Sequence, residues 1–230
     1  VYADAIDRVG REAERVLTYV AVDLTPPESR VDPIAPYWYD ASGILGIVKI
    51  TATTVDVFTV PPKPKVSVAL WYRYSSDNLV WGHWQLFGTD DEAPWSWWFT
   101  APSGDGYYEL YSIATDAAGN VERPPEGPDE RVRIDTTPPS SSVDHIEPYW
   151  QGSVPFTVSA TASDVLSGVA SVKLLYRSSI DNVNWSDWRL FGVDNEEPWS
   201  WSFTAPPVDG YYEFCSIATD VAGNVEGRQI

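Results

Sequence analysis

The sequence predicts an all-β chain of tandem β-sandwich domains, and three observations support this. A long stretch of sequence occurs twice, apolar residues alternate with polar ones at a period of two, and clusters of Gly, Pro, Asn and Asp separate these runs. No segment carries the apolar stripe of an amphipathic helix. We therefore expect short strands joined by turns throughout the chain.

The repeat sets the domain organisation. Residues 70–122 and 174–226 align without a gap at an offset of 104 residues, and most aligned positions are identical. Further upstream, the Pro-Tyr-Trp of residues 36–38 matches that of residues 148–150 at an offset of 112, so the first copy holds an eight-residue insertion. We expect this insertion near residues 55–65, where prolines interrupt any strand.

Similar linkers precede the two copies, VAVDLTPP at residues 20–27 and RVRIDTTPP at residues 131–139. They place one domain at residues 25–136 and another at residues 137–230. In the second domain, alternating runs predict strands near residues 140–147, 154–162, 169–178, 185–191, 198–205 and 210–219, with a seventh expected after Asn224. This number of short strands per domain is typical of a two-sheet sandwich.

Both ends of the chain are expected to be partial domains. Residues 1–12 resemble residues 214–225, so residues 1–24 are interpreted as the last strands of a preceding domain, and the second domain is expected to lack its final strand. Two interpretations follow. Either the chain is a window of a longer array, or its first strand is donated to the sheet edge of another copy. The donated residues would include Val16, Leu17, Tyr19 and Ala21.

Composition disfavours several functions. There are 33 acidic and 15 basic residues, a net charge of -18, which opposes binding to nucleic acid and to anionic membrane surfaces. No apolar run is long enough to span a bilayer, and the lone Cys215 excludes a disulfide framework or a Cys-based zinc site. The absence of Met indicates a processed or excerpted piece.

Motifs of catalysis are missing from the sequence. It contains no G-x-S-x-G, no H-E-x-x-H, no phosphate-binding glycine motif and no Cys–His pairing, and its histidines are limited to His83 and His145. We therefore expect no enzyme and assign no catalytic residue. An accessory role beside a hydrolase domain outside this chain stays open.

The repeated motifs resemble a known type of domain. The runs SATASDVLSGVASVKLLYR and DGYYEFCSIATDVAGNVE, preceded by DTTPP, look like the Ig-like repeats (immunoglobulin or fibronectin type III) of bacterial and archaeal surface or secreted proteins. The resemblance covers both copies and implies an extracellular stalk, spacer, surface-layer module or enzyme appendage. The first copy departs from it, because Thr54-Val55-Asp56 and a Pro-rich stretch replace the SD..SG motif.

Aspartates recur where such a sandwich receives its linker. The linker and two loops meet at one end of the domain, which brings carboxylates and amides together: Asp135, Asp164, Asp220 and Asn224 in the second domain, and Asp23, Asp116 and Asn120, with Asp56 as a further carboxylate, in the first. Clustered oxygen ligands suit Ca²⁺. The alternative is that Asp and Asn only cap turns, which requires no metal.

Two further residues are candidates for binding or modification. Four tryptophans recur in both copies and are expected to pack in the sandwich, whereas Trp98 is replaced by Ser202 in the second copy and is the candidate for stacking on a glycan. Asn184 begins an N-glycosylation sequon, Asn184-Trp185-Ser186.

Together these features predict a non-enzymatic structural module of an extracellular surface array or filament. Its partners would be neighbouring Ig-like domains or identical subunits stacked head to tail, joined by short Pro-containing linkers, with no nucleic acid and no membrane span. A carbohydrate-binding or adhesive module that uses exposed tryptophan is the alternative.

Overall fold

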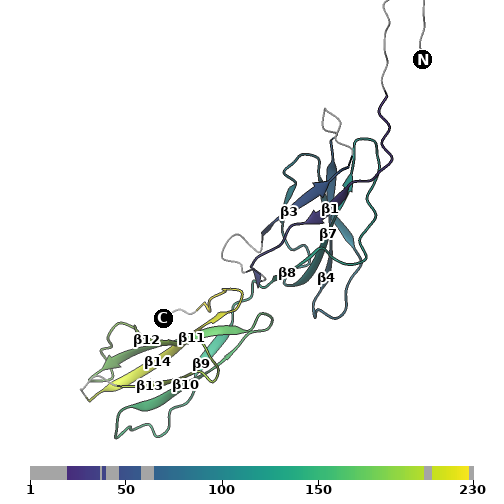
Figure 1. The fold of residues 1–230 in the computed structure, drawn as a ribbon. Helices are drawn as coiled ribbons and strands as arrows, with labels where there is room; N and C mark the ends of the chain where they lie inside the picture. Colours follow the sequence, from purple (N-terminus) through teal and green to yellow (C-terminus); the bar gives the residue numbers. More distant parts are fainter. Residues whose placement is uncertain (1–19, 37, 40–46, 58–64, 205–208, 228–230) are drawn as a thin grey trace, which may run out of the picture.

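The computed structural model describes residues 20–36, 38–39, 47–57, 65–204 and 209–227. These residues form strands in two domains that lie end to end (Figure 1). The first domain contains β1 (Glu28–Val31), β2 (Trp38–Tyr39), β3 (Val48–Val55), β4 (Ser67–Ser75), β5 (Gln85–Asp90), β6 (Ser96–Phe99), β7 (Gly106–Thr115) and β8 (Glu130–Ile134). The second contains β9 (Ser140–Val143), β10 (Phe156–Ser163), β11 (Val169–Ser179), β12 (Arg189–Asp194), β13 (Ser200–Phe203) and β14 (Tyr211–Asp220).

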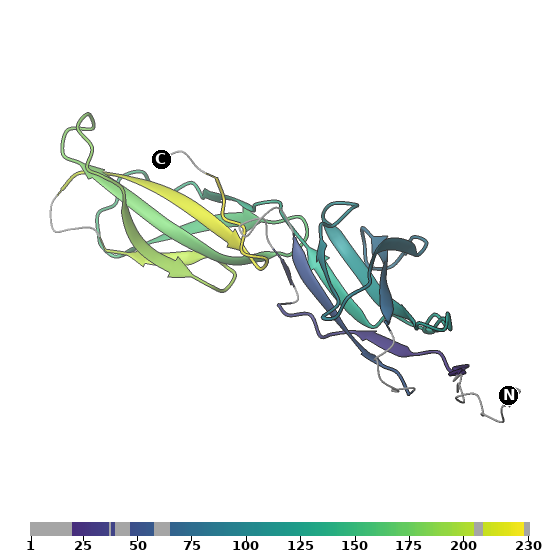
Figure 2. The same cartoon turned by 90° about the horizontal axis from the view of Figure 1, so that it is seen from above.

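Each domain consists of two facing sheets. In the first domain, the sheet β1-β3-β6 faces the sheet β2-β8-β7-β4-β5, and in the second the sheet β13-β10-β9 faces β12-β11-β14. Paired strands are antiparallel, except that β2 runs parallel to β8. Two views at right angles show an elongated molecule with one sandwich following the other (Figures 1 and 2). The all-β prediction is confirmed.

The sequence repeat is also a repeat of structure. β4 and β11 carry the same register shift at equivalent places, between Leu70 and Trp71 and between Leu174 and Leu175. β2 and β8 have no counterpart among the described strands of the second domain. The expected Pro-rich insertion falls largely outside the described residues.

Most strands predicted in the second domain lie within a few residues of the observed ones. The strand expected at residues 185–191 instead begins at Arg189. The side chain of Asp181 accounts for the difference, because its Oδ1 accepts hydrogen bonds from the N–H groups of Val183 and Asn184 and holds this segment in a turn. Beyond β14, the described chain makes a single bridge between Thr219 and Val225.

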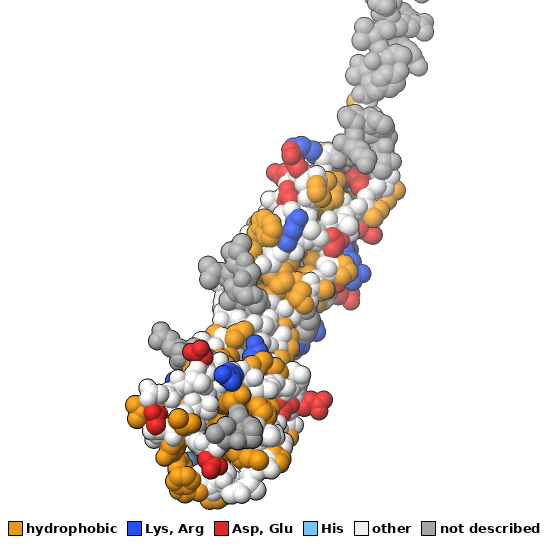
Figure 3. All heavy atoms as spheres, turned by 90° about the vertical axis from the view of Figure 1, so that its left-hand side faces the viewer, with side chains coloured by type: hydrophobic (Ala, Val, Ile, Leu, Met, Phe, Trp, Pro, Cys, Tyr) orange, Lys and Arg blue, Asp and Glu red, His pale blue; other side chains and the backbone are white. Residues whose placement is uncertain are grey.

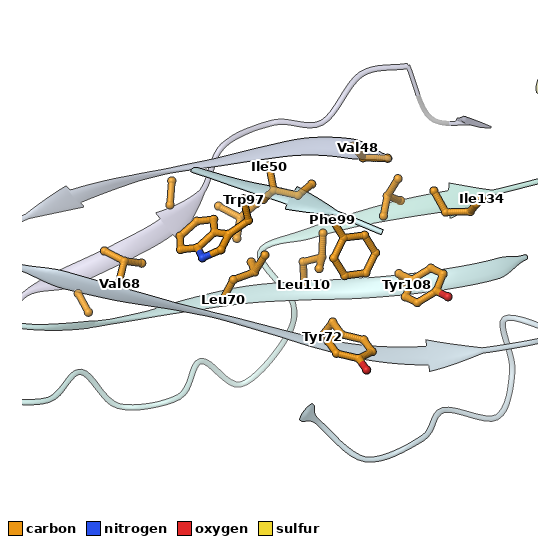
Figure 4. Packing of buried hydrophobic residues seen from close by; sticks show 14 residues of the cluster. Val48, Ile50, Val68, Leu70, Tyr72, Trp97, Phe99, Tyr108, Leu110 and Ile134 are labelled. Atoms are coloured by element: carbon orange, nitrogen blue, oxygen red, sulfur yellow. The ribbon is translucent and has the colours of Figure 1, made fainter. Parts of the chain in front are cut away.

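Side chains that alternate along the strands fill the space between the sheets. In the first domain, Phe99 of β6 and Tyr108 of β7 are both fully buried, and their rings meet edge to face with centroids 5.1 Å apart (Figure 4). In the second domain, the buried Phe203 contacts Phe214 in the same way at 4.8 Å. Aromatic packing of this kind lets short strands enclose a substantial core.

The surface mixes charges of both signs with apolar side chains. Acidic, basic and apolar groups are interspersed over both domains on the face drawn in Figure 3. Within the described part of the chain, no helix has the length and apolar character needed to cross a membrane.

Candidate metal centre

Two groups of three aspartates stand at equivalent places in the two domains. One consists of Asp135, Asp164 and Asp220, and the other of Asp23, Asp56 and Asp116. In each group, one carboxylate oxygen from every residue lies within 4.8 Å of the others. The structure thus brings together the carboxylates that the sequence placed at the entrance of each sandwich.

Three different elements position the group in the second domain. Asp135 directly follows β8, Asp164 directly follows β10, and Asp220 is the last residue of β14. Asp135 is fully buried and Asp220 nearly so. Strand ends deliver these side chains because the linker and two sheet connections meet at this end of the domain.

Each carboxylate also organises its own loop. Asp220 Oδ1 accepts hydrogen bonds from the N–H groups of Gly223 and Asn224, at 2.7 and 2.8 Å. Asp164 Oδ2 accepts from the N–H groups of Leu166 and Gly168, at 2.9 and 2.8 Å. The turn-capping interpretation is therefore correct for one oxygen of Asp220 and one of Asp164, and it leaves the other oxygen of each to be explained.

The second oxygens have different surroundings. Asp164 Oδ1 is buried and has no hydrogen-bond partner. Asp220 Oδ2 accepts a hydrogen bond from Asn224 Nδ2 at 2.8 Å, and Asn224 Nδ2 also donates to the carbonyl oxygen of Asp135 at 2.8 Å. Asn224 therefore presents its amide nitrogen to the group, whereas the sequence analysis expected its amide oxygen. It positions the carboxylates and the linker.

Burial and like charge act together on Asp220. Desolvation raises the pKa of Asp220 and the nearby charge of Asp135 raises it further, while hydrogen bonds from Asn224 and Gly223 act in the opposite direction. A carboxylate that remains hard to ionise despite these hydrogen bonds lacks a balancing cation. No Lys or Arg is salt-bridged to these three aspartates among the residues that the structure describes.

The group in the first domain has the same plan with more exposure. Asp116 Oδ1 caps its loop through the N–H groups of Ala118 and Asn120, both at 2.9 Å. Asn120 Nδ2 donates to Asp116 Oδ2 at 2.8 Å and to the carbonyl oxygen of Asp23 at 3.2 Å. Asp56, which occupies the place of Asp164, completes the group. The departure from the SD..SG motif has thus not removed the third carboxylate.

The donor set fits a hard divalent cation. All three side chains of each group offer carboxylate oxygens, which Ca²⁺ and Mg²⁺ prefer, and neither group includes a His or Cys. The buried Asp164 Oδ1 is the oxygen for which the protein itself provides no partner. Bound there, a cation would supply positive charge to carboxylates that otherwise repel one another.

The same place is the joint between the domains. The N–H of Asp135 donates to the carbonyl oxygen of Tyr39 in the first domain at 3.0 Å, while its Oδ2 accepts from the N–H of Ser167 in the second at 2.9 Å. The hydroxyls of Thr136 and Thr137 donate to the two carboxylate oxygens of Asp105, both at 2.8 Å. Every residue of the linker from Asp135 to Thr137 is therefore fixed by a side-chain contact.

Comparisons with known proteins concern the fold. No family model and no curated protein matches the chain. Among solved structures, fibronectin(III)-like modules of CbhA from Clostridium thermocellum match with 21% identity and a TM-score of 0.44, over 87% of this chain and 90% of that chain. Domains of titin match with 14% identity and a TM-score of 0.40, over 88% and 63%, and the FN1–FN3 domains of chicken CNTN1 with 11% and 0.37, over 97% and 70%.

The strand order decides the fold type. In both domains, a sheet made of the first strands faces a sheet that contains the last long strand, β7 or β14, beside β4 or β11. Both domains are Ig-like. The tandem Ig-like arrangement suggested by the repeated motifs is thereby confirmed.

Sequence analysis missed the role of the glutamate that ends the A-G-N-V-E motif in each Ig-like domain. Glu122 accepts hydrogen bonds from the N–H of Ser29 at 2.8 Å and from that of Ala114 at 2.8 Å. Glu226 accepts in the same way from Ser141 at 3.1 Å and Ala218 at 3.0 Å. This glutamate joins the first strand of one sheet to the last long strand of the other, and its identity in both copies was the available signal.

The repeated tryptophans are structural. The guanidinium of Arg73 lies 5.3 and 4.7 Å from the ring centroids of Trp81 and Trp84, and Arg177 repeats this arrangement with its own pair. The second repeated pair, represented by Trp97 and Trp201, packs in the two cores.

Trp98 differs from these residues. It is 66% exposed on β6, with Lys49 Nζ 5.9 Å from its ring centroid. A flat platform for a sugar requires several such rings, and Trp98 is the exposed Trp of the first domain within its described residues.

The remaining candidates occupy turns or lie outside the described residues. Asn184 is exposed, and its Nδ2 donates to Asp181 Oδ2 at 2.7 Å, so it has a place in the turn that does not depend on glycosylation. Val16, Leu17 and Tyr19 lie outside the described residues, and Ala21 is exposed in a segment that joins no sheet.

Proposed function

We propose that the chain is a non-enzymatic structural module of an extracellular array or filament, in which Ig-like domains stack end to end through joints stiffened by Ca²⁺. The observation that carries the proposal is Asp135, a fully buried linker residue that is hydrogen bonded to both domains and belongs to a group of three carboxylates. A module whose task is to hold a fixed direction needs such a joint, because flexible linkers let consecutive domains reorient.

Two features support a cation at the joint. Asp164 contributes a buried oxygen without a hydrogen bond, and Asp220 has a raised pKa, so both carboxylates would be stabilised by a positive charge. The group in the first domain stands where the preceding linker enters. The same joint would then recur along an array, with one cation at each domain entrance.

The extracellular setting rests on the resemblance of the repeats to those of surface proteins and on a fold that needs no disulfide. Cys215 is a buried free thiol, and in the first domain the equivalent position holds Tyr111. Antibodies against the protein that label intact source cells would support this placement, and labelling that requires permeabilised cells would contradict it.

Thermal unfolding tests the joint. We expect the melting temperature to rise with Ca²⁺ and to fall with a chelator, and small-angle scattering to report a narrower range of interdomain angles when Ca²⁺ is bound. Asp164→Asn should remove the effect in the second domain, whereas Asp187→Asn, at an exposed position outside the group, should leave it intact. A melting temperature and scattering curve that do not respond to Ca²⁺ would contradict the proposal.

A further inference from the structure

The outer edge of β14 differs from the equivalent edge in the first domain. There, β7 lies between β4 and β8, so both of its edges are paired. Its counterpart β14 pairs with β11 alone among the described strands, and it runs along one edge of its sheet (Figure 2, yellow). A free edge presents main-chain N–H and C=O groups that can accept another strand. The first domain shows what a strand in this position contacts.

The first contact is a charge. Glu109 of β7 has a side chain only 1% exposed and is held by two guanidinium groups: Arg73 donates from Nε at 2.6 Å and Arg131 of β8 from Nη2 at 2.6 Å. The equivalent Glu213 is paired with Arg177 at 2.6 Å, and its side chain is 43% exposed. The second domain therefore repeats one half of this ion pair, and the half that β8 supplies is missing from it.

The second contact is aromatic. The guanidinium of Arg133 lies 5.2 Å from the ring centroid of Trp38 and 5.1 Å from that of Tyr107. The equivalents of these rings in the second domain are Trp150, which is 76% exposed, and Tyr211. Exposed aromatic rings beside a sheet edge offer the same cation–π site to an arginine two residues after the first.

The third contact is polar. Asp105 accepts hydrogen bonds from the hydroxyls of Thr136 and Thr137, which follow β8. Its equivalent, Asp209, stands just before β14 and is exposed. The edge thus ends at a carboxylate placed to receive hydroxyl groups.

The inward face also repeats the pattern. Val132 and Ile134 of β8 are buried in the core of the first domain, beside the fully buried Tyr108. In the second domain, the equivalent Tyr212 and its neighbour Phe214 are only partly buried. A β-branched residue added at this edge would cover apolar surface.

We propose that the β14 edge is an acceptor site for an extended segment of a partner chain that alternates two arginines with β-branched residues and is followed by threonine. The segment runs antiparallel to β14. Its first arginine pairs with Glu213, its second lies against Trp150 and Tyr211, and its hydroxyls bind Asp209. This proposal rests on the proposed function, for which strand addition would be a lateral or end-to-end contact between modules.

The pattern distinguishes between segments of this sequence. Residues 129–137 read DERVRIDTT and carry both arginines. Residues 17–25 read LTYVAVDLT, and in the matching register Tyr19 and Ala21 replace Arg131 and Arg133. The segment that sequence analysis considered as a donor therefore lacks the charges that this edge would recognise, and it provides a matched comparison.

Fluorescence anisotropy with labelled peptides tests the proposal on the 230-residue chain. The peptide of residues 129–137 should bind saturably, and at least about tenfold more tightly than the peptide of residues 17–25, because the charge-assisted pair with Glu213 is lost in the latter. Glu213→Gln and Trp150→Ala should each weaken binding, while Glu196→Gln, an exposed change elsewhere on the domain, should not.

Hydrogen exchange gives a second measurement that does not depend on the labels. Bound peptide should slow amide exchange along residues 211–214. Absence of saturable binding, equal affinity for the two peptides, or an affinity unchanged by Glu213→Gln would overturn the proposal. Since the Ca²⁺ response of the joint is measured without peptide, either proposal can fail while the other stands.

Discussion

Asn224 Nδ2 donates a hydrogen bond of 2.8 Å to the main-chain carbonyl oxygen of Asp135, a residue 89 positions earlier. The same nitrogen donates to Asp220 Oδ2, so one buried amide connects the linker to the last loop of the second domain. Since the N–H of Asp135 is bonded to Tyr39 in the first domain, this contact is part of a continuous hydrogen-bonded path between the two domains.

Asn224→Ala should therefore affect both stability and domain orientation. Removal of the amide leaves buried oxygens of Asp135 and Asp220 without their donor, and we expect the second domain to lose about 1–3 kcal/mol of unfolding free energy, measured by urea denaturation. Asn195→Ala, at an exposed position, is the matched control. Equal stability of the two variants would show that the contact contributes nothing.

The two glutamates at equivalent positions in β7 and β14 should respond differently to the same substitution. Glu109→Ala removes a buried carboxylate that pairs with Arg73 and Arg131, and we expect a loss of about 3 kcal/mol in the first domain. Glu213→Ala removes a half-exposed partner of Arg177 and should cost less than about 1 kcal/mol. Urea unfolding followed separately for each domain measures both, and similar losses would contradict the role assigned to Arg131.

Sequence periodicity and the repeat were enough to predict the domains and most strands. Alternation along Phe156–Ser163 indicated a strand with one buried face, and the structure confirms it. The approach of Asp135, Asp164 and Asp220 also followed from the sequence, because the order of strands in a sandwich determines which loops share an end.

The orientation of polar groups could not be predicted in the same way. Whether Asn224 presents its oxygen or its nitrogen depends on which acceptors surround it, and these come from residues distant in sequence. The exposure of Trp150 was missed for a related reason. Its equivalent Trp38 pairs with β8, and in the described second domain no strand takes that position.

Gly106 is a position where a side chain would not fit. Its φ is +142°, and an added Cβ would lie 2.6 Å from Tyr74 Cε2 and 2.9 Å from the carbonyl oxygen of Ser75. We expect Gly106→Ala to destabilise the first domain by more than about 1 kcal/mol, measured by thermal unfolding. Gly127→Ala, where a Cβ meets nothing within 4 Å, should have little effect. A mild Gly106→Ala would mean that β7 and β4 separate easily at this end.

The pKa of Asp220 gives the last prediction, and its sign distinguishes the cation-free joint from the loaded one. Burial raises this pKa, and the charge of Asp135 adds to the effect. A carboxyl group with a raised pKa in the folded state stabilises the fold when protonated. That contribution is complete below the unfolded-state pKa and is lost as pH rises through the folded-state value. In chelator, the Asp220 charge should therefore oppose folding at neutral pH.

Carbon-13 NMR titration of the aspartate carboxyls can measure this. In chelator, Asp220 should titrate above its ordinary value, and Asp135→Asn should lower its pKa because the like charge is removed. Ca²⁺ should lower it as well, since a cation favours the ionised form. Asp144 is the internal reference: hydroxyl groups of Ser159 and Thr161 lower its pKa, and it lies outside both carboxylate groups, so Ca²⁺ should leave it unchanged. Equal responses of Asp220 and Asp144 to Ca²⁺ would indicate general screening by the added salt instead of binding at the joint.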